Sequence, residues 1–210
     1  MPKGSAALTQ ARKEEIIQAC SQLYAHKNFK EITMKDIADA TSFTRTSIYN
    51  YFQTKEEIFL ALLQQEYALW IKDLQMLQRE NSSMTVEEFA CAMAASLDKR
   101  HQLLKIIAMN HYDMEASSRM ENLISFKQTY SKTIQAVSDC LKKFFSMTER
   151  EIHEFLYVFF PFLFGVYPYA FATEKQKQAM AQAQFDHPQL TVYDLVHACV
   201  QKLLIAAAEK

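Results

Sequence analysis

Glycine and proline are scarce in this chain, whose 210 residues include two glycines and four prolines. Both residues interrupt helices, so their scarcity, together with abundant Ala, Gln, Lys, Glu and Leu, predicts an all-helical protein. The sequence also contains no glycine-rich phosphate-binding loop, no nucleophile-elbow motif and no zinc-protease motif. It therefore gives no support to the common nucleotide-binding and hydrolase classes.

Long apolar segments and paired cysteines are also missing. The four cysteines form no C-x-x-C motif, which is typical of separate thiols in a reducing cytoplasm. Residues 155–171 are seventeen residues without a formal charge, fewer than the ~20 needed to span a bilayer. The N-terminal residues lack the apolar region of a signal peptide. We therefore expect a cytoplasmic protein without membrane association.

Helix starts are marked by the capping-box pattern, a Thr or Ser followed three residues later by Asp or Glu. The pattern occurs at Thr33/Asp36, Thr54/Glu57, Thr85/Glu88, Ser118/Glu121, Thr148/Glu151 and Thr191/Asp194. Apolar periodicity after these sites predicts helices near residues 9–26, 54–79, 86–97, 102–111, 121–145, 149–171, 173–184 and 192–208. We expect the helix over 149–171 to bend at Pro161 and to be interrupted near Pro168.

Residues 32–60 predict two short helices separated by a tight turn, followed by the start of a third. The first short helix has Ile37 and Ala38 as its apolar face, the turn spans residues 41–43, and the second helix spans residues 44–51. That order is typical of a helix-turn-helix, in which the second helix enters the DNA major groove. Residues 1–55 have a net charge of +3 and residues 56–210 a net charge of −4, which favours phosphate binding at the N-terminal end.

These residues resemble the tetracycline-repressor (TetR) family of bacterial regulators. The resemblance extends from about Ala11 to Phe59, and its most specific part is Ile48-Tyr49-Asn50-Tyr51-Phe52 followed by Lys55-Glu56-Glu57-Ile58-Phe59. It implies an N-terminal three-helix DNA-binding domain over residues 1–54 and a larger helical effector-binding and dimerisation domain over 55–210. Where the family commonly has glycine, this chain has Ser42, so we expect a mildly strained φ there or a slightly different turn. Phe43 is expected to pack beneath the motif.

Arg45, at the start of the second helix, is the principal candidate for a base contact, because its fork matches the acceptors of guanine. A phosphate contact is the alternative. Thr44 is expected to cap the helix, and Lys55 to contact a phosphate at the next helix start. The full set of predicted DNA-binding residues is Thr33, Lys35, Thr44, Arg45, Thr46, Ser47, Tyr49, Asn50, Tyr51 and Lys55.

The resemblance also implies an effector pocket and a four-helix dimer interface in the larger domain. A mostly apolar pocket would suit a lipophilic or aromatic ligand, although ordinary core packing explains the same residues. The predicted pocket residues are Trp70, Phe89, Met93, His111, Tyr112, Phe126, Tyr130 and Phe159. The predicted interface residues are Tyr157, Phe160, Phe164, Val192, Leu195, Val196, Cys199, Val200 and Leu203.

Together these features predict a homodimeric, sequence-specific transcriptional regulator, a repressor released from a palindromic operator by a small effector. A DNA-bound adaptor whose larger domain binds a protein partner stays open. The other alternative is a helical-bundle metal enzyme, because Asp98/His101 and Asp194/His197 have the D-x-x-H spacing of some metal sites. Di-iron bundles, however, use Glu-x-x-His and further glutamates. We therefore expect no enzyme activity, no cofactor and no metal site.

Overall fold

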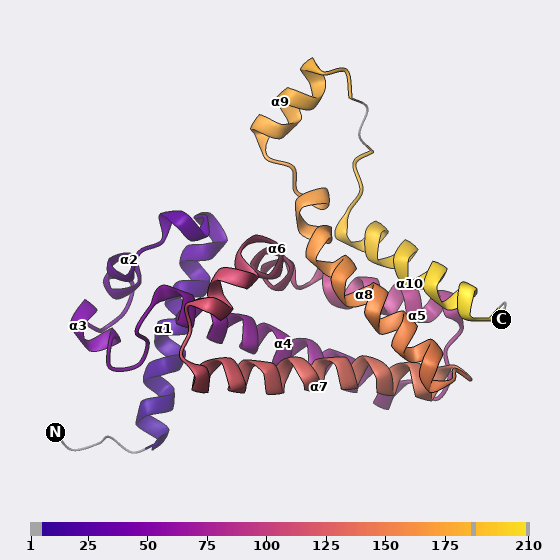
Figure 1. Cartoon of the computed structure of the whole chain (residues 1–210), viewed down its shortest axis with the longest axis horizontal. Helices are drawn as coiled ribbons and strands as arrows, with labels where there is room; N and C mark the ends of the chain where they lie inside the picture. Colours follow the sequence, from indigo (N-terminus) through magenta and orange to yellow (C-terminus); the bar gives the residue numbers. More distant parts are fainter. Residues whose placement is uncertain (1–5, 186–187, 209–210) are drawn as a thin grey trace. The chain divides into compact units, whose positions relative to one another are not determined.

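The computed structural model describes residues 6–185 and 188–208, and every regular element in these ranges is helical (Figure 1). The elements in chain order are α1 (Ala6–His26), the 3-10 helix η1 (Phe29–Glu31), α2 (Met34–Asp39), α3 (Arg45–Ile48), α4 (Lys55–Glu80), α5 (Val86–Asp98), α6 (His101–Ala116), α7 (Met120–Phe144), α8 (Glu149–Ala170), α9 (Glu174–Gln182) and α10 (Val192–Ala208). The predicted all-helical fold class is confirmed.

The chain divides into two compact units, each made of two segments. The head unit comprises Met1–Glu66 and Asn110–Tyr130, and the body unit comprises Tyr67–Met109 and Ser131–Lys210. The long helices α4, α6 and α7 therefore each contribute residues to both units. This division does not test the predicted boundary after residue 54 between the DNA-binding domain and the larger domain, which stays a prediction.

The head unit is built around the apolar face of α1. Ile16 and Cys20 are fully buried on that face, and the buried Tyr24 ring meets the Phe59 ring edge-on at a centroid distance of 5.0 Å. The Phe29 ring contacts Phe59 at 4.7 Å, so η1 packs on the same cluster. These contacts hold the first turns of α4 against α1.

In the body unit, α10 lies along α5 and α8 (Figure 1). Its buried residues Val192, Val196, Val200 and Leu204 recur every four positions, which is the spacing of one helical face. Trp70 is also fully buried, with the rings of Phe159 and Phe160 at 6.5 and 6.2 Å, and its indole N–H donates to the Ser96 hydroxyl at 3.0 Å. Apolar burial therefore accounts for the packing of α10 and of the Trp70 cluster.

The helix α8 continues through both of its prolines to Ala170. The predicted interruption near Pro168 is therefore wrong. A proline removes its own N–H from the helical ladder, but the rest of the helix can persist when packing supports it. Here Leu163 and Val166 are buried between the two prolines, whose own side chains lie on the exposed side.

Four of the six predicted capping boxes form as expected, at Thr33, Thr85, Thr148 and Thr191. The Ser118 hydroxyl instead donates to the Met114 carbonyl at 2.7 Å, so that predicted cap is wrong. A further box, in which Gln replaces the acid, begins α9 at Thr173 and Gln176. Thr54 accepts from the Glu57 N–H, but the Glu57 carboxylate binds elsewhere.

Among the described helices, none is by itself long and apolar enough to cross a membrane. The pair α8 and α9 meets the length and composition criteria only in combination, with a bend of 78° between the two helices.

Candidate nucleic-acid interface

The first short helix of the motif, α2, begins with a complete capping box. The Thr33 hydroxyl accepts the Asp36 N–H at 3.2 Å, and the Asp36 carboxylate accepts the Thr33 N–H at 2.8 Å. The Lys27 ammonium approaches the same carboxylate at 3.1 Å. The hydrogen bonds from Thr33 and then Lys27 hold the pKa of Asp36 well below its usual range. Thr33 thus has a clear structural role beside its predicted DNA contact.

The turn between α2 and α3 is held by the side chain of Glu15 on α1. The Glu15 carboxylate accepts the Ser42 N–H at 2.8 Å, and this hydrogen bond is the main reason why the pKa of Glu15 is lowered. Among the described non-glycine residues, only Gln184 has a positive φ, so the strain expected at Ser42 is absent. Phe43 is half-buried, with its ring 6.3 Å from that of Tyr51.

The second helix, α3, is shorter than the predicted span of 44–51. Thr44 is its N-cap, as expected, and accepts the Ser47 N–H at 3.2 Å. Beyond Ile48 the chain continues in turns, with the Tyr51 N–H donating to the Ile48 carbonyl at 2.8 Å. Ile48 is fully buried, and Phe52 almost so, which fixes the inner side of the motif.

The outer side of α3 is formed by the predicted DNA-binding residues. Arg45, Thr46, Tyr49 and Asn50 are all exposed, and Ser47 is half-buried. The Arg45 guanidinium donates to the Tyr49 hydroxyl at 3.1 and 3.3 Å and lies 5.8 Å from the ring centroid. Because the Tyr49 oxygen is the acceptor, its own proton is available to another acceptor. The structure thus brings the predicted base-contacting residue and a second predicted DNA-binding residue, Tyr49, together on one surface.

Lys55 is placed differently from Arg45. Its ammonium donates to the Phe29 carbonyl at 2.7 Å and to the Ile32 carbonyl at 3.0 Å, and it lies 4.2 Å from the Phe29 ring centroid. An ammonium has three donors, so two of them are engaged inside the head unit. The primary role that the structure gives Lys55 is to tie α4 to η1, and the phosphate contact stays a prediction.

The remaining predicted contacts lie on neighbouring elements. Lys35 is exposed on α2. Tyr51 is half-buried and accepts a hydrogen bond from the Arg12 guanidinium at 2.9 Å. Arg12 also lies 5.8 Å from the Phe43 ring centroid. Arg12 is not among the predicted DNA-binding residues, because the first helix was predicted from its apolar face and Arg12 lies on the polar face.

An ion pair between a buried carboxylate and a half-buried guanidinium lies behind the motif, at the start of α4. Glu57 is 1% exposed, and its carboxylate accepts from the Arg119 guanidinium at 2.7 and 2.9 Å and from the Arg119 N–H at 3.0 Å. Arg119 also donates to the Tyr51 carbonyl at 3.1 Å. Burial would raise the pKa of Glu57, but these hydrogen bonds and that from the Gln53 N–H lower it to about 2. The turn between α6 and α7 is thereby joined to the motif within the head unit.

The predicted pocket residues fall into two groups. Trp70, Phe89, Met93 and Phe159 belong to the body unit and are fully buried there. His111, Tyr112, Phe126 and Tyr130 belong to the head unit. Tyr112 is 83% exposed, which puts its ring at the surface and corrects the expectation that it lines a pocket.

The head-unit group differs from the body-unit group in that it contains titratable side chains. The Phe126 and Tyr130 rings stack at 6.1 Å, and the His111 imidazole lies 2.8 Å from the Glu115 carboxylate. Burial lowers the pKa of His111 and raises that of Tyr130. These two side chains are the polar groups of this aromatic cluster.

The body unit also contains an open cavity of about 310 Å³. It is lined by Asp98, His101, Ala170, Phe171, Gln189, Leu190, Thr191 and Val192. Within it, the His101 and Phe171 rings meet edge-on at 4.8 Å. None of the eight residues predicted for the pocket lines this cavity, although Val192 was predicted for the interface.

The predicted interface residues divide by the direction in which they face. Phe160, Val192, Val196 and Val200 are buried against helices of their own chain, so the structure places them on the inner faces of α8 and α10. Tyr157 is 78% exposed, and Phe164, Leu195, Cys199 and Leu203 are half-buried. Only this second set can offer surface to a partner. Val158, Tyr169 and Ile205 are further exposed apolar residues of α8 and α10 that the predicted set does not include.

The two D-x-x-H spacings have separate roles. His101 lies 3.4 Å from Asp98. The Asp194 carboxylate accepts the Thr191 N–H and hydroxyl as a helix cap, whereas His197 lies 3.0 Å from Glu87. Asp194 and His197 therefore do not act as the pair that their spacing suggested.

Comparisons with known proteins agree with this arrangement. Residues 16–62 match the tetR family of bacterial regulatory proteins, and residues 64–205 match a tetracyclin repressor-like C-terminal domain. The fold resembles that of the fatty acid degradation regulator FadR from Bacillus halodurans, with a TM-score of 0.58, 18% identity and 97% of each chain covered. It also resembles FadR from Bacillus subtilis in complex with stearoyl-CoA, with a TM-score of 0.57, 16% identity, and 92% of this chain and 98% of that chain covered.

Sequence similarity to curated relatives is confined to a shorter region. The uncharacterised HTH-type transcriptional regulator YfiR of Bacillus subtilis is 32% identical over 63 residues, which are 30% of this chain and 31% of the relative. The HTH-type transcriptional repressor KstR2 of Mycolicibacterium smegmatis is 28% identical over 61 residues, 29% of either chain. The chain thus spans about a third of the curated relatives that it matches. The two family matches nonetheless extend over most of its length, and the chain belongs to the tetR family of transcriptional regulators.

Proposed function

We propose that this protein is a homodimeric repressor that binds a palindromic DNA operator through α3 and leaves it when a small lipophilic or aromatic molecule binds. The observation that supports this most directly is the outer side of α3, where Arg45 and Tyr49 form an exposed hydrogen-bonded pair. No catalytic role is proposed for any residue, and the proposed site of action is the cytoplasm, where the operator would be.

Sequence-specific binding requires both phosphate contacts, which set the register, and base contacts, which select the sequence. An arginine at the start of a recognition helix can donate two hydrogen bonds to guanine. Thr46 is exposed beside Arg45 and can approach a base edge closely. Tyr49 on the same surface and Lys35 on α2 are exposed and are suited to phosphate contacts. For the DNA complex we therefore propose base contacts by Arg45 and Thr46 and phosphate contacts by Tyr49 and Lys35.

Dimerisation would provide the symmetry that a palindrome requires. The outward residues of α8 and α10, including Tyr157, Phe164 and Leu203, present an apolar surface that we propose as the interface. In a dimer that grips a palindrome, the two recognition helices lie about 34–36 Å apart, one turn of DNA. The spacing of the two heads would therefore control DNA affinity.

The ion pair between Glu57 and Arg119 is the element through which we propose that an effector acts. It joins the start of α4, next to the motif, to the turn after α6. Since α6 extends from the body unit into the head unit, a ligand that shifted α6 would alter the position of Arg119. A ligand lowers DNA affinity by as much as its preference for the released state.

The test is DNA binding by the full-length protein, first as a footprint on the DNA that flanks its own gene and then as a fluorescence titration. Long-chain acyl-CoA thioesters are the first effector probes, because solved structures of two similar regulators, FadR from Bacillus subtilis and from Thermus thermophilus, hold stearoyl-CoA and lauroyl-CoA. The proposal expects a two-fold symmetric footprint that one such lipophilic probe abolishes. If a footprint forms and no lipophilic or aromatic probe weakens it, the effector part of the proposal fails while the DNA-binding part stands.

A further inference from the structure

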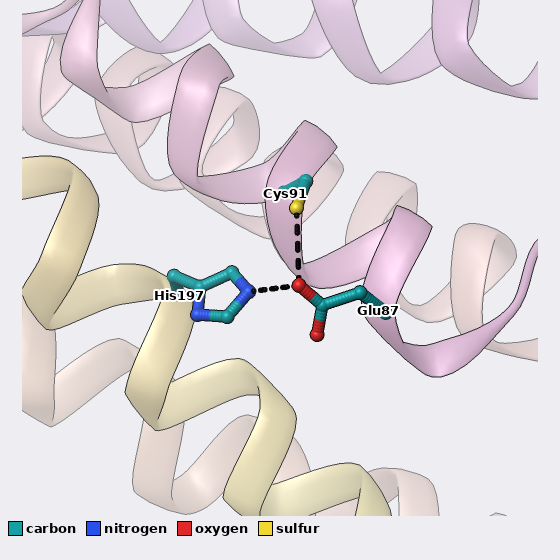
Figure 2. Close-up of side chains that lie close together, drawn as sticks. All are labelled: Glu87, Cys91 and His197. Atoms are coloured by element: carbon teal, nitrogen blue, oxygen red, sulfur yellow. Dashed lines mark hydrogen bonds and ion pairs between the residues drawn. The ribbon is translucent and has the colours of Figure 1, made fainter.

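Three side chains with metal-binding atoms meet where α5 and α10 pack together (Figure 2). The Glu87 carboxylate oxygen Oε1 lies 3.0 Å from His197 Nε2 and 3.5 Å from Cys91 Sγ. The three ligand atoms all lie within 4.8 Å of one another. One oxygen, one nitrogen and one sulfur donor thus lie close together.

The fold positions this cluster by ordinary helix packing. Glu87 and Cys91 are four residues apart on α5, so their side chains lie on one face, one helical turn apart. The opposite partner, His197, follows Val196, which is buried. Burial of the valines of α10 therefore brings the His197 imidazole to the same edge of α5 as Glu87 and Cys91.

Two further side chains fix the orientation of the donor groups. Gln201, one turn after His197, donates to the second Glu87 oxygen, Oε2, at 2.8 Å. The Tyr193 ring, one turn before His197, stacks on the imidazole at 5.9 Å with an interplanar angle of 12°. Hydrogen bonds to the outer atoms of a ligand side chain are a regular feature of metal sites, where they orient the group that binds.

We propose that Glu87, Cys91 and His197 form a binding site for a zinc-type divalent cation. A zinc ion binds Cys sulfur at about 2.3 Å and His nitrogen or carboxylate oxygen at about 2.0–2.2 Å, which sets tetrahedral donor atoms roughly 3–4 Å apart. The separations of 3.0 and 3.5 Å already lie in that range. Three protein ligands leave a fourth position for water.

The chemistry of the donor set selects the class of cation. Thiolate and imidazole ligands suit Zn²⁺ and related transition metals, whereas Mg²⁺ and Ca²⁺ prefer oxygen donors. Binding replaces the Cys91 S–H bond by a metal–sulfur bond and releases that proton to solvent, while neutral His197 donates its Nε2 lone pair. Glu87 is 58% exposed, so the cation has access from solvent.

An ion pair between Glu87 and His197 alone is the competing explanation. It would need neither Cys91 nor a metal, and it would link α5 to α10 with the strength of an exposed pair. A bound cation would instead link the two helices through metal–ligand bonds and raise the stability of the body unit. The inference does not rest on DNA binding, so its test is separate from that of the repressor function.

The experiment uses full-length protein that is reduced and stripped of metal by a chelator. Co²⁺ is added as a spectroscopic substitute, and Zn²⁺ then competes with it. We expect one Co²⁺ per chain, the charge-transfer absorption of a cobalt–thiolate bond, loss of that absorption on addition of Zn²⁺, and a rise in the thermal midpoint with Zn²⁺.

Variants assign the absorption to this cluster. Cys91→Ser should abolish the cobalt–thiolate absorption, whereas Cys199→Ser, which changes the other half-buried cysteine of these two helices, should keep it. Gln201→Ala should weaken Zn²⁺ binding about 10–100-fold, the usual effect of losing an orienting hydrogen bond. Circular dichroism of each variant checks that the helices persist.

The same measurements can overturn the proposal. If Co²⁺ gives no thiolate absorption with the wild-type protein, the cluster is an ion pair with a neighbouring thiol. If the absorption survives in Cys91→Ser, or if His197→Gln binds Zn²⁺ as tightly as the wild type, the metal binds elsewhere in the chain.

Discussion

Two cationic side chains near the helix-turn-helix, Arg45 and Lys55, have opposite environments. Arg45 lies on the exposed outer side of α3, and its hydrogen bonds within the head unit go to Tyr49, four residues along the chain. Lys55 lies at the inner junction, where its ammonium donates to the carbonyls of Phe29 and Ile32. Both residues belong to the motif by sequence, but Arg45 is exposed, whereas Lys55 is half-buried and uses two of its three donors inside the head unit.

The contrast shows that a sequence motif identifies a functional region but does not show which of its residues contact DNA and which stabilise the fold. The outer side of α3 presents exposed polar groups, whereas Ile48 is buried on the inner side, so the outer side is suited to contact another molecule. The inner junction combines Lys55 with the ion pair between buried Glu57 and half-buried Arg119, and it is suited to hold the head unit together. Mutations at the inner junction should therefore change stability, and those on the outer side should change DNA recognition.

The largest effect is expected at the inner junction, from Arg119→Ala. This change leaves the Glu57 carboxylate buried without its guanidinium, and breaking a buried pair in this way costs about 3 kcal/mol. Chemical denaturation of the full-length protein measures the loss. The double variant Glu57→Gln/Arg119→Ala should be more stable than Arg119→Ala, because it removes the uncompensated charge. A loss below about 1 kcal/mol for Arg119→Ala would mean that the pair contributes no more than a surface ion pair.

The same pair predicts a loss of stability in acid. Hydrogen bonding lowers the pKa of Glu57 to about 2 from an ordinary value of 4.5. A carboxyl whose pKa is lower in the folded state stabilises the fold fully above its ordinary pKa, and the contribution is lost as pH falls through the folded value. Between pH 4.5 and 2, the wild type should therefore lose more stability than Glu57→Gln. An equal loss of stability by the two proteins over this pH range would show that Glu57 is not the carboxyl responsible.

On the outer side, Arg45→Ala should reduce discrimination between operator and shuffled DNA by about 2 kcal/mol, the scale of one bidentate base contact. Stability should change little, because the side chain is exposed. The matched control is Lys35→Ala, which should weaken binding to both DNAs equally and reduce the salt slope by about one unit. If Arg45→Ala also weakened both DNAs equally, Arg45 would be a phosphate contact.

Lys55→Ala separates the structural role from the predicted phosphate contact. Removing the ammonium leaves the Phe29 and Ile32 carbonyls without their donor and should cost about 1–2 kcal/mol of stability. Lys30→Ala, which changes an exposed lysine of η1, should stay within about 0.5 kcal/mol of the wild type. Unchanged stability with a reduced salt slope of DNA binding would assign Lys55 to the outer, DNA-contacting set.

The smallest effect is expected at Thr44, which stabilises α3 as its cap and is also a predicted DNA-binding residue. Thr44 is exposed and caps α3, so Thr44→Ala should cost about 1 kcal/mol. Thr44→Ser keeps the capping oxygen and should preserve both stability and operator affinity. An affinity loss in Thr44→Ser would show instead that the methyl group contacts DNA.

The sequence predicted the fold well because helix starts and apolar faces are local signals. Thr148 and Thr191 begin their helices as the capping boxes indicated, and α10 has the predicted bounds. Ser118 has the same local pattern, but its hydroxyl binds the preceding turn of α6. Local patterns cannot choose between two nearby acceptors, and they cannot show that packing will carry a helix past Pro168.

The sites were less predictable because their partners lie far apart in the chain. Arg119 is 62 residues from Glu57, and His197 is 110 residues from Glu87. No spacing rule connects such residues before the helices are packed. The same limit applies to Lys55, whose acceptors come from η1 and the residue that follows it. It also applies to Val196, because its apolar stripe indicated a buried face but not whether the helix that covers this face belongs to the same chain.

The most direct test of the central assignment, that the outer side of α3 selects a DNA sequence as part of a dimer, is selection from a pool of random duplexes by the full-length protein. Selection by the wild type should enrich a two-fold symmetric sequence with half-site centres about 10 base pairs or a multiple apart, and Arg45→Ala should enrich that sequence much less strongly. Enrichment of an asymmetric sequence, or equal enrichment by both proteins, would contradict it.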